Sequence, residues 1–241
     1  MTEVLPTPPP EGSPAQLVAR PLHTAILVAV FLGIAAAGGI FQAHGPSVGG
    51  AGATRPDVVP LYASLLLLEW GLVYFVWRGI RRRGTRVRDL IGGRWAGPGD
   101  LARDAAVAAL LWLLWLGIQR GFDLWFGADH ARSVAPLLPR GFVEVPLWIA
   151  LSLSAGFCEE LVFRGYLQRQ FGALARNRPA GVVLQAVLFG VGHAYEGLGA
   201  VAKIIAFGLL YGSVALWRRS LRPGMIAHAW SDIWSGWLGL L

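Results

Sequence analysis

Three short groups of ionisable residues near the C-terminus of this 241-residue chain could carry acid–base chemistry. They are Glu159-Glu160-Leu-Val-Phe-Arg164, Phe189-Gly-Val-Gly-His193 and His228-Ala-Trp-Ser-Asp232. Carboxylates and imidazoles are the side chains that most often move protons near neutral pH. Each group lies inside or at the edge of an apolar stretch, where a charged side chain costs about 2.5–3.5 kcal/mol on insertion scales. Charges placed at such a cost indicate a function.

Helical spacing assigns different roles to the two adjacent glutamates. Glu160 and Arg164 are four residues apart, with the glutamate first, and this arrangement predicts an ion pair on one helix face. Glu159 is turned by about 100° from Glu160 and points elsewhere. We therefore expect Glu159 to be a general base or acid and the Glu160–Arg164 pair to be structural.

The other two groups place their ionisable residues on one helix face each. Phe189 and His193 are four residues apart, and Gly190 and Gly192 leave room for a neighbouring helix or a substrate. His228 and Asp232 are also four residues apart. Asp232 can therefore either orient His228 or project beside it into the same cavity.

Each group also has a structural interpretation when it is taken alone. Glu159 and Glu160 could lie at a solvated helix end, His193 could be a packing histidine, and His228 with Asp232 could form an interfacial pair. Polar groups inside a helical bundle tend to converge on one another. Three such groups on three successive apolar stretches therefore favour one shared functional site.

Two further polar residues receive structural interpretations. Glu69 has no acid or histidine nearby in the sequence, so we predict a structural hydrogen bond for it. Cys158 adjoins Glu159, but adjacent residues on a helix do not face each other, which argues against a thiol nucleophile activated by that glutamate. Cys158 is also the only cysteine, which excludes an intramolecular disulfide.

The elements that position these residues are predicted to be membrane-spanning helices. The chain is 55% hydrophobic and 15% charged, whereas soluble domains carry about 25% charged residues. Its long apolar runs do not alternate with period two, and lipid requires every backbone polar group to be satisfied internally, so helices are favoured over a barrel. We predict an all-α, polytopic transmembrane helical bundle of about seven spans. The spans are 22–43, 58–77, 101–119, 142–162, 180–193, 198–217 and 225–241.

The chain divides into three predicted parts. Residues 1–21 form a proline-rich, disordered cytoplasmic tail, residues 22–141 form variable N-terminal transmembrane helices, and residues 142–241 form the catalytic helical core. The span at 180–193 is short and is expected to be tilted, buried, or joined to the next span by a turn at Glu196-Gly197.

The distribution of arginine predicts the topology. An N-terminus on the inside places 16 arginines in inside segments and 4 in outside segments, a strong positive-inside bias. We therefore predict a multi-pass protein of the plasma (inner) membrane with a cytoplasmic N-terminus. The net charge of +7 comes from these connectors, and no basic region of soluble-domain length is present, which excludes nucleic acid as a partner.

One geometric condition must hold if Glu159 and His193 are to meet. His193 lies about 13 residues, or ~20 Å, from the inner end of its helix. Glu159 lies near the inner end of the span at 142–162. The two residues reach the same depth only if this helix continues past Arg164 toward Arg176.

The ordered set of three motifs, each on its own apolar helix, resembles the CPBP family of intramembrane proteases. This family includes type II CAAX prenyl endopeptidases and bacteriocin-immunity (ABI) proteins. The resemblance covers about residues 140–241. It implies an intramembrane endopeptidase that acts on a protein or peptide substrate, in some cases a lipidated one, in contact with the lipid bilayer.

The resemblance also implies residue roles. Glu159 and His193 would activate a water, and His228 with the residue at 232 would stabilise the oxyanion. Many members have asparagine at that last position, and an ionised Asp232 cannot donate a hydrogen bond as asparagine does. Asp232 is therefore either protonated or an orienting partner of His228. The supporting residues are Glu160, Arg164 and Phe189.

Metal dependence and rival functions remain open at this point. Glu159, His193 and His228 could form a two-histidine, one-carboxylate zinc site, but the chain has no His-Glu-x-x-His motif. The resemblance favours metal-free catalysis, so we expect no metal and no cofactor. The alternatives to an enzyme are a scaffold or bacteriocin-immunity protein that binds a partner through the same cavity, and a proton or ion transporter.

Overall fold

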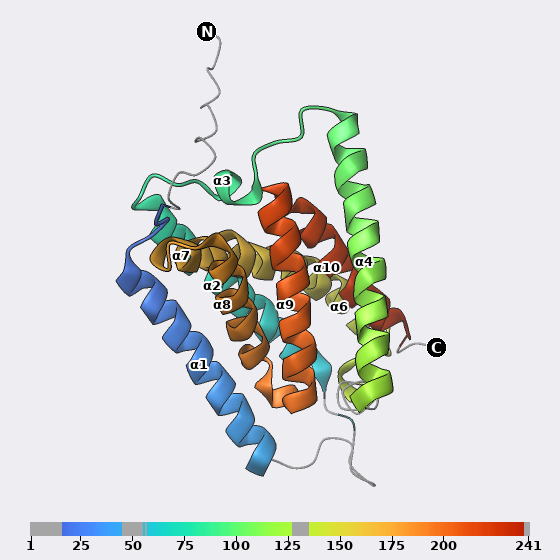
Figure 1. Ribbon diagram of the computed structural model, residues 1–241. Helices are drawn as coiled ribbons and strands as arrows, with labels where there is room; N and C mark the ends of the chain where they lie inside the picture. Colours follow the sequence, from blue (N-terminus) through green and yellow to red (C-terminus); the bar gives the residue numbers. More distant parts are fainter. Residues whose placement is uncertain (1–15, 45–54, 56, 127–134, 239–241) are drawn as a thin grey trace.

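The computed structural model describes residues 16–44, 55, 57–126 and 135–238, and the regular structure in these ranges is helical (Figure 1). The fold class predicted from the sequence is therefore confirmed. Most of the predicted proline-rich tail, residues 1–15, lies outside the described residues. The α-helices are α1 (Pro21–His44), α2 (Val58–Arg81), α3 (Val87–Ile91), α4 (Pro98–Phe126), α6 (Glu144–Glu159), α7 (Gln168–Leu174), α8 (Arg178–Gly192), α9 (Leu198–Arg218) and α10 (Arg222–Leu238).

Five helical stretches within the described residues are long and apolar enough to cross a membrane. They are 21–40, 58–81, 98–125, 144–174 and 198–218. The outer helices expose large apolar side chains, such as Leu22, Leu67 and Leu113, as expected where lipid replaces water. The chain is therefore an integral membrane protein. Helices α8 and α10 have only 15 and 17 residues, so the predicted count of seven crossings stays a prediction.

A single long helix carries the glutamate motif through the centre of the bundle. It runs without a break from Glu144 to Leu174, and this confirms the predicted continuation past Arg164. Its middle, Glu160–Leu167, is wound as a π-helix. The wider hydrogen-bonding pattern is seen at its end, where the N–H of Gln168 donates to the carbonyl of Phe163. Stretches of π-helix are rare and are often found at functional sites.

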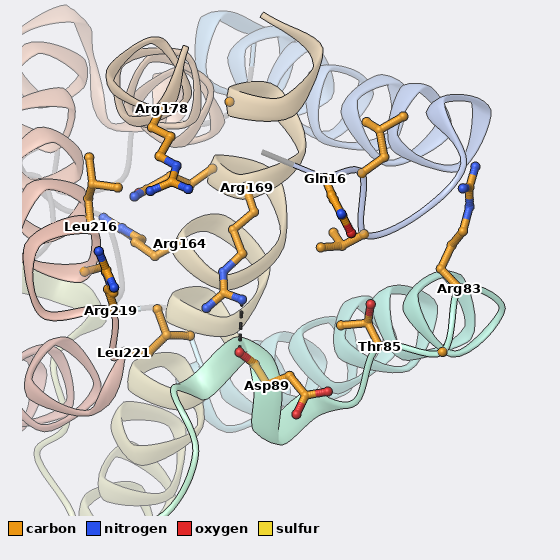
Figure 2. A pocket seen from close by; sticks show the side chains of 16 residues that line it. Gln16, Arg83, Thr85, Asp89, Arg164, Arg169, Arg178, Leu216, Arg219 and Leu221 are labelled. Atoms are coloured by element: carbon orange, nitrogen blue, oxygen red, sulfur yellow. Dashed lines mark hydrogen bonds between the residues drawn. The ribbon is translucent and has the colours of Figure 1, made fainter. Parts of the chain in front are cut away.

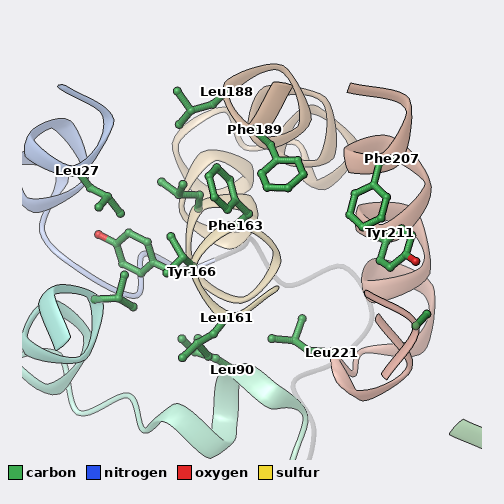
Figure 3. Packing of buried hydrophobic residues seen from close by; sticks show 14 of the residues in the cluster. Leu27, Leu90, Leu161, Phe163, Tyr166, Leu188, Phe189, Phe207, Tyr211 and Leu221 are labelled. Atoms are coloured by element: carbon green, nitrogen blue, oxygen red, sulfur yellow. The ribbon is translucent and has the colours of Figure 1, made fainter. Parts of the chain in front are cut away.

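The main core forms around this π-helical segment. Figure 3 shows Phe163 and Tyr166 of the segment packed among side chains of α1, α8 and α9, including Leu27 and Phe189. Phe163 contacts Phe189 with ring centres 4.7 Å apart. Because the segment is buried all round, it holds the glutamates at a fixed depth.

Helix α10, which carries the third motif, approaches the long helix closely at two glycines. A side-chain carbon at Gly156 would lie 2.7 Å from Cβ of Ala229. A side-chain carbon at Gly224 would lie 2.9 Å from a carboxylate oxygen of Glu160. Only glycine permits this spacing, and small residues of this kind commonly bring membrane helices together.

The arginine-rich connectors gather at one end of the bundle. In Figure 1 the starts of α1, α4 and α10 and the ends of α2, α7 and α9 lie toward the upper end. Connectors that the sequence assigned to one side of the membrane therefore do lie on one side of the fold. Their cytoplasmic location stays a prediction.

Candidate active site

The buried side chain of Glu160 links the first motif to the third, because it contacts a residue of each. Its Oε1 lies 3.2 Å from Nη1 of Arg164, and both side chains are inaccessible to solvent. The predicted ion pair is therefore present. The same Oε1 accepts a hydrogen bond from Nδ1 of His228 at 3.1 Å. Glu160 consequently orients the imidazole in addition to pairing with Arg164.

Aromatic rings surround the buried charges. The guanidinium carbon of Arg164 lies 4.5 Å from the ring centre of Phe189 and 5.3 Å from that of Phe207. The Phe207 ring also packs edge-on against His228, at 4.8 Å between centres. Phe189, predicted as a supporting residue, thus contacts the arginine of the first motif through a cation–π interaction.

The second nitrogen of His228 faces two other carboxylates. Its Nε2 lies 3.7 Å from Oε2 of Glu159 and 3.7 Å from Oδ2 of Asp232. These distances are longer than a hydrogen bond and leave room for a bridging group. Because Nδ1 is held by Glu160, Nε2 is directed toward Glu159, and Asp232 lies beside that nitrogen.

A cavity of about 140 Å³ brings Glu159 and His193 together. Its polar lining includes Glu159, His193, Glu69, Cys158 and Tyr195, and its other walls are mainly apolar side chains of α1, α2, α8 and the long helix. His193 directly follows α8, and its Nδ1 bonds the carbonyl of Phe189 at 2.8 Å. If Nδ1 is the donor, Nε2 of His193 is an acceptor.

Sequence reasoning missed the position of Glu69. Its carboxyl group, contributed by α2, lines the cavity that contains Glu159. The side chain is 8% exposed. Its Oε2 has no hydrogen-bond partner among the described residues, so the structural hydrogen bond predicted for Glu69 stays a prediction. The signal in the sequence was the presence of an acid within an apolar span, which is itself costly.

The described residues hold no group of three or more His, Cys, Asp and Glu side chains arranged to bind a metal ion. Glu159 and His193 line the cavity, while His228 presents its free nitrogen from outside that lining. Among the described residues, Glu159, His193 and His228 are therefore not arranged as the zinc site considered from the sequence.

The structure thus brings the three predicted motifs to one location. Glu159 connects the second motif with the third, because it lines the cavity together with His193 and also faces Nε2 of His228. A carboxylate between an imidazole and a small cavity can accept and return a proton. A properly protonated imidazole can stabilise an oxyanion.

Comparison with protein families yields a match for the segment that carries all three motifs. Residues 141–234 match the family described as type II CAAX prenyl endopeptidase Rce1-like. Searches among curated proteins and among solved structures gave no significant match. Residues 141–234 are therefore similar to the Rce1-like type II CAAX prenyl endopeptidases, and this similarity supports, at the level of the family, a CAAX protease-like intramembrane endopeptidase.

Proposed function

We propose that the chain cleaves peptide bonds with a water activated by Glu159. The position of Glu159, between His193 in the cavity and Nε2 of His228, carries this proposal. The cavity is large enough to admit water. In the first step, the Glu159 carboxylate accepts a proton from a water held with His193, and the water oxygen adds to the scissile carbonyl carbon.

The following steps use His228 and return the proton. The doubly protonated imidazole of His228 donates Nδ1–H to Glu160 and Nε2–H to the oxyanion. Collapse of the tetrahedral intermediate breaks the C–N bond, and protonated Glu159 delivers its proton to the leaving amine. Asp232 acts as an orienting partner beside Nε2, because an ionised carboxylate cannot itself donate to an oxyanion.

The proposed substrate is a prenylated protein or peptide that reaches the site from within the membrane. The apolar walls contributed by α1 and α2, including Phe31, Ile34 and Leu68, support an apolar substrate. The proposed location is the plasma membrane with a cytoplasmic N-terminus, supported by the 16 to 4 bias of arginine.

The test is a comparison of peptides from membranes that contain the wild-type protein or the Glu159→Ala variant. We expect mass spectrometry to find cleavage products that only the wild type generates. Because no step uses a metal, the same products should persist when a chelator is added. Identical peptide sets for the two proteins would refute the proposed mechanism, and loss of the products with chelator would refute metal-free catalysis.

We further propose that Glu69 hydrogen-bonds the substrate through its unpartnered Oε2. The Glu69→Leu variant should lower kcat/KM for a prenylated CAAX peptide by about tenfold, the effect of one lost hydrogen bond to a charged or polar partner. Its thermal stability should be unchanged or higher, because the leucine removes a buried oxygen that lacks a partner.

The matched control is Glu144→Gln. Glu144 lies at the start of α6 and forms an ion pair with Arg55, with 2.8 Å between Oε2 and Nη2. This variant should keep the wild-type kcat/KM. If Glu69→Leu also keeps it, the role assigned to Glu69 is wrong.

A further inference from the structure

A second and larger cavity lies at the arginine-rich end of the bundle. Its volume is about 730 Å³, and its lining comes from the segment before α1, the α2–α3 connection, the long helix, the start of α8 and the end of α9. Five arginines and one aspartate line it (Figure 2). The charged lining residues are Arg83, Arg164, Arg169, Arg178, Arg219 and Asp89.

The arginines approach one another from different elements. Figure 2 shows the guanidinium groups of Arg164, Arg178 and Arg219 gathered at one wall. Arg169 extends across the cavity and donates to the main-chain carbonyls of Asp89 and Leu90, at 2.9 and 2.8 Å. Hydrogen bonds to carbonyls hold its side chain in place but do not neutralise its charge.

Two further features make this end of the cavity positive. Arg178 is the first residue of α8, so the partial positive charge of a 15-residue helix adds to the guanidinium charges. The nitrogens Nε, Nη1 and Nη2 of Arg164 have no hydrogen-bond acceptor among the described residues, although Glu160 pairs with the charge. Among the described residues that line the cavity, five guanidinium groups therefore stand against one carboxylate.

A phosphate group is the ligand that fits this chemistry. Guanidinium groups bind phosphate oxygens in a bidentate manner, and phosphate presents three oxygens to several arginines at once. Basic pockets between transmembrane helices at the cytoplasmic side are recognition sites for anionic lipid headgroups. A single carboxylate would satisfy fewer of the converging donors.

We infer that this arginine-lined cavity binds a phosphate group, from an anionic phospholipid headgroup or from free phosphate. The occupied cavity would stabilise the ends of α2, α7 and α9 relative to one another, because its lining residues come from these elements. Binding would also change the electrostatic environment of Arg164. Arg164 pairs with Glu160, and Glu160 in turn accepts a hydrogen bond from His228.

The test compares the thermal stability of the full chain in three environments. These are nanodiscs of phosphatidylcholine, nanodiscs that also contain phosphatidylglycerol, and phosphatidylcholine nanodiscs with inorganic phosphate in the buffer. We expect an anion to raise Tm by about 3–6 °C at a concentration about ten times its dissociation constant. A shift with phosphatidylglycerol alone assigns the site to a lipid headgroup, and a shift with inorganic phosphate assigns it to the free ion.

A double variant distinguishes the cavity from general electrostatic attraction. Arg178→Gln with Arg219→Gln removes two cavity arginines, and Arg120→Gln with Arg140→Gln removes the same charge from α4 and from the segment before α6, outside the cavity lining. The ligand-dependent rise in Tm should be lost in the first variant and kept in the second. Absence of a rise in the wild type, or an equal rise in both variants, would overturn the inference. The readout is independent of hydrolysis, so it stands apart from the proposed mechanism.

Discussion

The Glu159→Gln variant is expected to slow hydrolysis of a prenylated CAAX peptide by about 10²–10⁴-fold, the usual contribution of a general base. Glutamine keeps the size and shape of the side chain but cannot accept the proton of the water. Glu159 is 25% exposed at its side chain, so loss of its charge should cost little stability. The effect should appear in kcat, because the amide still occupies the same place beside the substrate.

The measurement is steady-state hydrolysis by purified protein, together with the Tm of each variant. Cys158→Ala is the matched control, because Cys158 is the adjacent residue and also lines the cavity. Its kcat should stay within about threefold of the wild type, since the proposed mechanism assigns the thiol no role. Wild-type turnover by Glu159→Gln would refute the proposed base, and an inactive Cys158→Ala with normal stability would point to the thiol instead.

The second large effect is expected on stability. In Glu160→Gln, the buried guanidinium of Arg164 loses the carboxylate that pairs with it at 3.2 Å. Breaking a buried ion pair by removing one partner typically costs about 3–5 kcal/mol. We therefore expect a clear fall in the free energy of unfolding, measured by denaturant titration in detergent micelles.

A double variant separates the structural role of Glu160 from its contact with His228. Replacing both partners, Glu160→Leu with Arg164→Leu, removes the unpaired charge and should recover most of the lost stability, because apolar substitution of a buried pair is often neutral or stabilising. Hydrolysis should remain low, because Nδ1 of His228 loses the acceptor that orients it. A stable double variant with wild-type turnover would show that Glu160 does not act through His228.

Local periodicity accounts for what could be predicted about the site. The Glu160–Arg164 pair depends only on residues within about one helical turn, so four-residue spacing predicted it and the structure confirms it. A turn at Glu196-Gly197 was one of three alternatives expected for the short span at 180–193, and the chain between α8 and α9 forms a short 3₁₀ turn followed by Gly197 at a φ of 98°. The continuation of the fourth span was required by the depth of His193 and is confirmed by the unbroken helix to Leu174.

Contacts between distant elements account for what was missed. Glu69 is 90 residues from Glu159 in the sequence, and no spacing rule relates α2 to α6. The hydrogen bond of Glu160 to His228 was also not predicted, because spacing within α10 indicated Asp232 as the partner of that histidine. The close approach at Gly156 and Gly224 decides this pairing, since it places Nδ1 of His228 on Glu160.

The sequence by itself determined that this protein is a helical membrane protein, which residues could do chemistry, and which protease family its C-terminal segment resembles. Composition and short-range spacing contain this information, because the bilayer forces apolar runs into helices and helices repeat every few residues. Only the tertiary structure decided that Glu159 lies between two histidines and that Glu69 lines the cavity that contains Glu159. It also decided that five arginines line a second cavity. Those relations depend on how closely helices pack against one another, and this is set by side-chain shape across the bundle rather than by order along the chain.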